Sequence, residues 1–437
     1  MFSLKYLSLG KTVTKNSFIH EFHTQQEPPV DTCKLNYIIA ILLGAGTLFA
    51  YNAIIAGGDY YKASFPGKKL EYYAPMATSI ISPFLQFLGI HLVLALGKNI
   101  CIYTTLVGNA ICVVLVPILI AQLNVQDGFN AALACMLAIG AFGAVNLVTI
   151  FPLFASFPFL FLQAVMMGQG LSGVIVSVLR VVTRAIYPHT DEGNQQSARL
   201  YFTVAGSFTL FCVVAYTVLK CTPFAKYYLG KAEAEALKAK AIEEENRHAI
   251  NDEPLLANVH GDSAENLPSS MGTVMCNILP AIFNISSIFI VTFLSFPGLM
   301  LSIAPTIDID EGDFNTYNIL LFNVFDFIGR TLPSIGLLWN EKNVHIPVIF
   351  RFITYPLFIL AAKSHYAFFN SSYFVFGLIA FFAVSNGYLS SIVMMTASNF
   401  SSPQDREMTS SLMSTFLTAS ILVGSMLALG IDSIFWS

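Results

Sequence analysis

The stretch Phe322-Asn323-Val324-Phe325-Asp326-Phe327-Ile328-Gly329-Arg330 decides the class of fold. It places a carboxylate and a guanidinium inside an apolar run from about 314 to 339, which is long enough to cross a bilayer as a helix. At 3.6 residues per turn, Asn323, Asp326 and Arg330 fall on one face of that helix. A charged side chain at the bilayer centre costs about 2.5–3.5 kcal/mol, so this face is expected to line a bundle interior or a watery cavity. An ion pair that only fixes helix packing is the alternative interpretation.

The composition excludes an ordinary soluble domain. Of the 437 residues, 55% are hydrophobic and only 11% are charged, which is typical of a chain that lies mostly in a lipid bilayer. The net charge of -4 includes no basic block, so a nucleic-acid partner is not expected. The seven cysteines form no CxxC pair, which argues against a zinc site or a disulfide framework. We therefore expect neither a metal nor a cofactor.

Ten further apolar segments accompany the first, and each is long enough to span a membrane. Together they predict an all-α multi-pass membrane protein with eleven transmembrane helices. The ten segments lie at about 36–60, 72–97, 100–122, 128–150, 158–182, 200–219, 272–303, 346–362, 373–397 and 408–435.

Changes of composition divide the chain into four parts. They predict a cytosolic N-terminal tail, a six-helix bundle, a cytosolic and partly disordered loop, and a five-helix bundle at 1–35, 36–219, 220–271 and 272–437. Basic residues in the loops are more numerous on the side of the tail and the long loop. This count includes Arg351 as a loop residue on that side. The positive-inside rule makes that side cytosolic. We expect a monomer in the plasma membrane, with an endomembrane as the alternative.

Polar side chains and glycines recur inside other apolar segments. The segment at 36–60, which is the first of the eleven in chain order, contains Tyr51 and Asn52. The segment at 373–397, the tenth in that order, contains Ser385-Asn386-Gly387-Tyr388. In the fifth segment, Gly168, Gln169, Gly170 and Gly173 lie close together, and such small residues predict close helix packing. Hydrogen-bonding groups scattered over separate helices are typical of a site where a polar, uncharged solute crosses between two halves.

Five motifs resemble those of the equilibrative nucleoside transporter family, in details closer to its plant and protist branch. They are Gly46-Thr47-Leu48 with Asn52, Gly168-Gln169-Gly170-Leu171, Phe296-Pro297-Gly298, the stretch from Phe322 to Arg330, and Ser385-Asn386-Gly387-Tyr388. The resemblance extends from about residue 37 to the end of the chain. It implies a major-facilitator-like bundle in which six N-terminal and five C-terminal helices rock around a central site.

The resemblance also implies roles for individual residues. Asp326 and Arg330 would bind the ribose hydroxyls of a nucleoside. Asn323 would contact the substrate and, with Phe296 and Pro297, would lie near the outer gate. The base would lie among the first, second and fourth segments, near Leu48, Tyr51, Asn52, Ile55, Phe84, Asn146 and Leu147.

Two positions depart from the family pattern where the nucleobase is expected to bind. The family often has Pro-Trp-Asn where this chain has Ala50-Tyr51-Asn52, so the stacking surface is smaller and carries a hydroxyl. The family's glutamine in the fourth helix falls on Leu147, beside Asn146. Recognition of the base by an amide at that point is therefore open.

Three alternatives bear on the kind of protein and on its energetics. An intramembrane enzyme is not expected, because the sequence lacks a nucleophile with a nearby histidine and acid, paired carboxylates or a metal-binding motif. A multi-pass receptor is a distant alternative. Facilitated diffusion of nucleosides, and of nucleobases as further substrates, is favoured over proton symport because Arg330 favours the ionised form of Asp326. Protons are the partner that the symport alternative requires.

Overall fold

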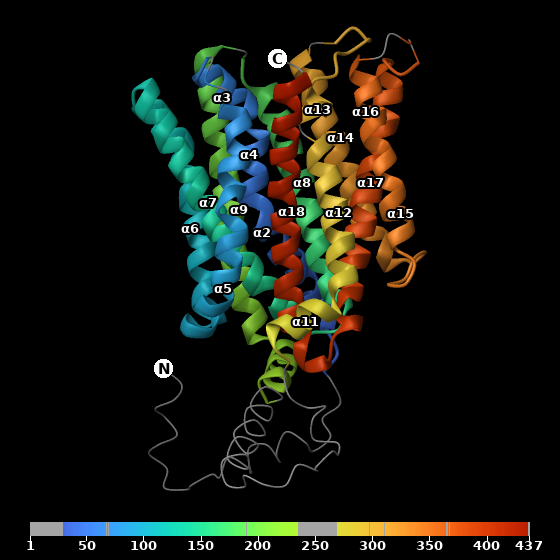
Figure 1. The fold of residues 1–437 in the computed structure, drawn as a ribbon. Helices are drawn as coiled ribbons and strands as arrows, with labels where there is room; N and C mark the ends of the chain where they lie inside the picture. Colours follow the sequence, from blue (N-terminus) through green and yellow to red (C-terminus); the bar gives the residue numbers. More distant parts are fainter. Residues whose placement is uncertain are drawn as a thin grey trace, which may run out of the picture.

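The computed structural model describes residues 29–435, apart from residues 67, 69, 189, 235–268, 297, 310, 364, 365 and 367. The described chain forms a bundle of helices that run along a common axis, and it contains no β-strand (Figure 1). The first long helix begins at one end of the bundle, and the last helix ends at the other. We call these the N-terminal end and the C-terminal end. The predicted tail and long loop lie largely outside the described residues, as does Pro297.

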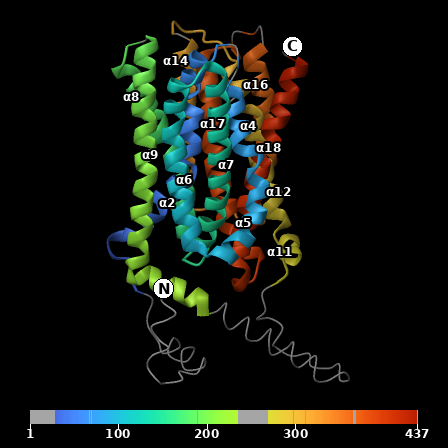
Figure 2. The same cartoon turned by 90° about the vertical axis from the view of Figure 1, so that its left-hand side faces the viewer.

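The residues before 235–268 form the first half of the bundle. Its helices are α2 (Leu35–Ala56), α3 (Gly58–Ser64), α4 (Leu70–Ile80), α5 (Ser82–Leu96), α6 (Lys98–Gln122), α7 (Val125–Ala155), α8 (Leu160–Ile186) and α9 (Asp191–Cys221). Figure 2 shows α7 between α6 and α4, in agreement with the contacts of these helices.

The residues after the gap form the second half. Its helices are α11 (Met271–Asn277), α12 (Leu279–Ser295), α13 (Gly298–Leu301), α14 (Glu311–Thr331), α15 (His345–Phe350), α16 (Thr354–Lys363), α17 (Ser372–Thr396) and α18 (Arg406–Phe435). Short 3-10 turns follow α14 at Leu332–Ser334 and join α15 to α16 at Arg351–Ile353.

Nine helical stretches of the described chain are long and apolar enough to cross a membrane. The prediction of an all-α multi-pass membrane protein is therefore confirmed, whereas the count of eleven stays a prediction. The segments at 72–97 and 314–339 are not among the nine. The first is broken into α4 and α5, because Pro83 in the first turn of α5 has no N–H with which to continue α4. The second ends as a helix at Thr331, two residues before Pro333.

The two halves meet along α8 and α14. The first-half helix α8 packs against α2 and α14, and α14 in turn packs against α17. Glycines allow these close approaches: a Cβ added at Gly168 would overlap the carbonyl oxygen of Ile41, and one added at Gly387 would overlap that of Asp326. This close packing brings polar groups of four helices to the middle of the bundle.

Candidate functional site

A cavity of about 150 Å³ lies between the two halves. Its walls come from α2, α4, α5, α7 and α8 in the first half and from α12, α14, α17 and α18 in the second. A water molecule occupies about 30 Å³ in the liquid, so the cavity has room for more than single waters. Asn323, Asp326 and Arg330 all line it, as their spacing on one helical face predicts.

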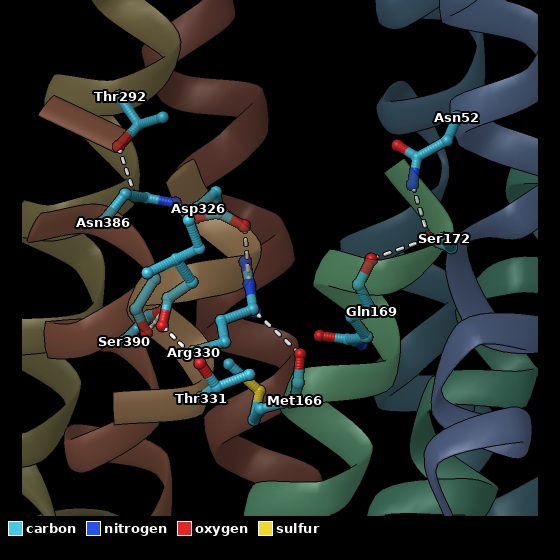
Figure 3. Close-up of polar contacts among 12 residues, drawn as sticks. Asn52, Met166, Gln169, Ser172, Thr292, Asp326, Arg330, Thr331, Asn386 and Ser390 are labelled. Atoms are coloured by element: carbon cyan, nitrogen blue, oxygen red, sulfur yellow. Dashed lines mark hydrogen bonds and ion pairs between the residues drawn. The ribbon is translucent and has the colours of Figure 1, made fainter. Parts of the chain in front are cut away.

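The ion pair between Asp326 and Arg330 is the electrostatic centre of the cavity. Arg330 Nε donates to Asp326 Oδ2 at 2.7 Å, and each of the two residues is only 5% exposed. Asn386 Nδ2, on α17, donates to the other carboxylate oxygen at 2.7 Å, while Thr292 on α12 donates to Asn386 Oδ1 at 2.7 Å (Figure 3). Three helices of the second half therefore fix the position of one carboxylate.

Contacts from α8 hold α14 against the first half. Arg330 Nη1 approaches the carbonyl oxygen of Met166 at 3.5 Å, and Asn323 Nδ2 donates to Ser177 Oγ at 2.8 Å. The packing leaves no room for side chains on α8 at two points: a Cβ at Gly170 would lie 2.7 Å from Arg330 Cδ, and a Cβ at Gly173 would lie 2.7 Å from Asn323 Oδ1. The guanidinium thus lies at the boundary between the halves.

Amide and hydroxyl groups line the opposite wall (Figure 3). Asn52 Nδ2 on α2 donates to Ser172 Oγ at 2.7 Å, and Ser172 Oγ donates to the carbonyl oxygen of Gln169 at 2.7 Å. Gln169 Nε2 donates to Thr47 Oγ1 at 3.1 Å, so this predicted packing residue also lines the cavity. Tyr51 lines the cavity and hydrogen-bonds the side chain of Ser79.

Apolar groups complete the lining. Leu48, Ile55 and Leu147 all contact the cavity. The rings of Phe296 and Phe322 stack beside it, with centroids 4.3 Å apart and planes 11° apart. A polar stripe between apolar walls can bind a solute that carries hydroxyls at one end and a flat, less polar group at the other.

Two predicted base contacts lie away from the cavity. Phe84 is 70% exposed and does not line it, because the polar residues Ser82 and Gln86 turn the opposite face of α5 inward. Ser82 Oγ donates to the carbonyl oxygen of Gly140 at 3.1 Å, a bond inside the bundle that leaves the Phe84 ring outside. Asn146 is fully buried but does not line the cavity, and its amide has no hydrogen-bond partner among the described residues.

Arg351 differs from its predicted place in a loop. It lies within the helical stretch His345–Lys363 and is 2% exposed. Its Nε donates to Ser385 Oγ at 2.9 Å, and its terminal nitrogens donate to the carbonyl oxygens of Ile288 at 2.9 Å and Phe382 at 3.2 Å. A guanidinium can satisfy its planar fork of donors with such carbonyl oxygens. The number of basic loop residues on the predicted cytosolic side therefore falls by one.

Hydroxyl groups on α18 also line the cavity, and sequence reasoning missed them. Ser414 and Thr418 both contact it, and Gln86 Nε2 on α5 donates to Thr418 Oγ1 at 2.7 Å. The signal that could have found them is the helical spacing of hydroxyls at 411, 414, 415 and 418.

The architecture defines the class of protein first. The fold is similar to that of the proton:xylose symporter XylE bound to 6-bromo-6-deoxy-D-glucose, with a TM-score of 0.65, 11% identity and coverage of 93% of this chain and 90% of that one. It is also similar to the major facilitator superfamily transporter FucP in its outward conformation, with a TM-score of 0.59, 13% identity and coverage of 91% and 92%. The chain has a major-facilitator-like fold.

The sequence then identifies the family. The family model described as "Nucleoside transporter" matches residues 133–432, and the chain belongs to that family. It is 26% identical to equilibrative nucleotide transporter 1 of Arabidopsis thaliana, over 94% of this chain and 88% of the relative. It is also 26% identical to equilibrative nucleoside transporter 2 of Homo sapiens, over 92% and 98% of the two chains. The protein is a membrane transporter and not an enzyme, as predicted.

Proposed function

We propose that this protein carries nucleosides across a bilayer by alternating access, with Asp326 and Arg330 binding the ribose hydroxyls. The observation that carries the proposal is the buried, paired carboxylate and guanidinium in a cavity between the two halves. A vicinal diol offers both hydrogen-bond donors and acceptors, so a carboxylate beside a guanidinium complements it without a change of charge. Arg330 has more N–H groups than its two contacts use, which leaves donors for a solute.

The base is assigned to the first-half wall of the cavity. Leu48, Ile55 and Leu147 supply apolar surface there, and Tyr51 supplies an aromatic ring with a hydroxyl. Asn52 is a further candidate contact, although its amide already bonds Ser172. This wall lies across the cavity from the ion pair, which suits a solute with a sugar at one end and a base at the other.

The stack of Phe296 on Phe322, together with Asn323, supports a gate beside the sugar site. Asn323 joins α14 to α8 through Ser177, so separation of these helices requires that bond to break. Phe296 follows the last residue of α12, where the helix ends and the chain can bend. We assign these residues to the outer gate, and the same role is proposed for Pro297.

Facilitated diffusion is the proposed energetics, with proton symport as the alternative. Asp326 accepts hydrogen bonds from Arg330 Nε and Asn386 Nδ2, each at 2.7 Å, and we assign it to binding of the solute rather than to carriage of a proton. We further propose a monomer in the plasma membrane, with the N-terminal end of the bundle facing the cytosol.

The test is uptake of radiolabelled adenosine and uridine into proteoliposomes that contain the purified protein. Uptake is measured with and without an inward proton gradient, and the Arg330→Ala variant serves as the control. Equilibration that ignores the gradient supports a facilitative nucleoside carrier. Accumulation above equilibrium instead establishes a symporter, and no uptake of either nucleoside by folded protein would overturn the assignment of substrate.

A further inference from the structure

The main-chain carbonyl of Arg330 is bonded across the two halves. Because α14 ends at Thr331, no later N–H group of the helix can donate to its last carbonyl oxygens, and these oxygens need other donors. Gln163 Nε2, in the first turn of α8, donates to the Arg330 carbonyl oxygen at 3.1 Å. Gln163 is fully buried, so water does not replace this bond while the interface is closed.

The Arg330 carbonyl can only accept, so it sets the direction of the Gln163 amide, and Tyr37 supports that direction. Its hydroxyl donates to Gln163 Oε1 at 2.8 Å, which leaves the NH₂ group to face the Arg330 carbonyl. Tyr37 lies in the first turn of α2, and Gln163 lies in the first turn of α8. The bonds therefore join α2, α8 and α14 at the N-terminal end of the bundle.

The side chain of Arg330 makes a second bond across the same interface. Its Nη1 approaches the Met166 carbonyl oxygen at 3.5 Å, which is long for a hydrogen bond, while its Nε is held by Asp326 at 2.7 Å. A solute hydroxyl that accepts from the unused N–H groups draws the guanidinium toward the cavity and away from the Met166 carbonyl. One residue thus contacts the cavity with its side chain and closes the interface with its backbone.

A matching bond lies nearer the C-terminal end of the same helix pair. Asn323 Nδ2 on α14 donates to Ser177 Oγ on α8 at 2.8 Å. The antiparallel helices α8 and α14 are therefore joined by one short polar bond on each side of the ion pair. Opening of the interface toward either end breaks a different one of the two bonds.

We propose that Gln163 is a positioning residue that holds the N-terminal end of the α8 and α14 interface closed through the main-chain carbonyl of Arg330. When the Arg330 guanidinium binds substrate, it leaves the Met166 carbonyl and the closure weakens. Only this second step rests on the proposed nucleoside transport. The closure itself follows from the two bonds that join Tyr37, Gln163 and Arg330, since a buried carbonyl without a donor is unfavourable.

The first test compares half-saturation constants from the two sides of the membrane. Gln163→Leu removes the bond at the N-terminal end, and Ser177→Ala removes the bond nearer the C-terminal end. For uridine, we expect Gln163→Leu to raise KM at the C-terminal face by at least about fivefold and to lower it at the N-terminal face. Ser177→Ala should shift both constants in the opposite directions, and Tyr37→Phe should act like Gln163→Leu but less strongly. Equal changes on both sides would mean that Gln163 only maintains the fold or the site, and would overturn the proposal.

The second test needs no substrate. Gly143 lines the cavity, and a Cβ there would meet no atom within 4 Å, so the Gly143→Cys variant places a thiol in open space. A membrane-impermeant maleimide is applied at the N-terminal face, and peptide mass spectrometry reads its attachment to position 143 separately from the native cysteines. Adding Gln163→Leu should speed this labelling at least about fivefold. An unchanged labelling rate in folded protein contradicts the closure even if the wild-type protein carries no nucleoside, a result that would count against the proposed function alone.

Discussion

Asn386 donates from Nδ2 to the Oδ1 of Asp326 at 2.7 Å, on the carboxylate oxygen that Arg330 does not contact. The amide can face in only one direction, because the Asp326 carboxylate can only accept and must face the NH₂ group, which leaves Asn386 Oδ1 to accept from Thr292 at 2.7 Å. The carboxylate is therefore held by partners from α14 and α17, while each of its oxygens keeps a lone pair for a solute. Fixed acceptors of this kind lose little entropy when a ligand binds.

Replacement of Asn386 by alanine should lower uptake about tenfold with little loss of expression. A hydrogen bond to a charged group contributes about 1.5–3 kcal/mol, and its loss lets the Asp326 carboxylate rotate away from the cavity. Uptake of uridine is measured per transporter molecule in the membrane. Ser390→Ala is the matched control on α17, because Ser390 donates to the Gly387 carbonyl oxygen at 3.2 Å and does not line the cavity. Equal effects of the two changes would count against a special role for Asn386.

Replacement of Arg330 by alanine should abolish transport. It leaves Asp326 buried without its counter-charge, and breaking a buried ion pair in this way costs about 3–5 kcal/mol. Arg330→Lys should rescue only part of the uptake, since an ammonium group lacks the planar fork that contacts both Asp326 and Met166. Uptake and the amount of correctly inserted protein are measured together. Near-normal uptake by a correctly inserted Arg330→Ala variant would refute the central site.

The sequence predicted the polar face of α14 because charged groups inside an apolar run have few places to lie. Asp326 and Arg330 must face away from lipid, and helical spacing then brings Asn323 to the same side. The close approaches at Gly168 and Gly387 follow the same logic, since small residues mark helix contacts. These predictions depend on one helix at a time.

The sequence could not place residues whose position depends on the rotation of a helix or on a partner on a distant helix. Phe84 lies outside because Ser82 and Gln86 find partners on α7 and α18, which no local pattern reveals. Arg351 was counted among the loop charges, although the apolar segment predicted at 346–362 contains it. Its actual partners are carbonyl and hydroxyl groups on α12 and α17, more than 30 residues away from it in either direction in the sequence.

Replacement of Gly387 by alanine should destabilise the protein strongly. The added Cβ would overlap the Asp326 carbonyl oxygen and lie 2.8 Å from Arg330 N, so α14 and α17 would have to separate. Overpacking of this kind costs about 1–3 kcal/mol or more. Thermal unfolding of the detergent-purified protein measures the effect. Gly377→Ala on the same helix is the control: no atom lies within 4 Å of its added Cβ, and the change should be neutral or slightly stabilising. Similar melting temperatures for the two variants would contradict the close packing at Gly387.

Replacement of Tyr51 by tryptophan should change the preference among bases more than the overall rate. The larger ring adds stacking surface and removes the hydroxyl that bonds Ser79, and aromatic pairs contribute about 0.5–1.5 kcal/mol beyond burial. We expect the ratio of adenosine to uridine uptake to change about threefold or more, a shift that corresponds to energies of that size. Tyr51→Phe separates loss of the hydroxyl from gain of ring area.

Phe84→Ala is the control for this series, because Phe84 is an aromatic residue of the first half that is 70% exposed and lies outside the cavity. Its uptake and base preference should match the wild type. Adenosine and uridine are offered in competition to the same vesicles, so differences in expression cancel. An unchanged base profile in Tyr51→Trp would remove Tyr51 from the base pocket, whereas an altered profile in Phe84→Ala would mean that the second segment faces the substrate during the transport cycle.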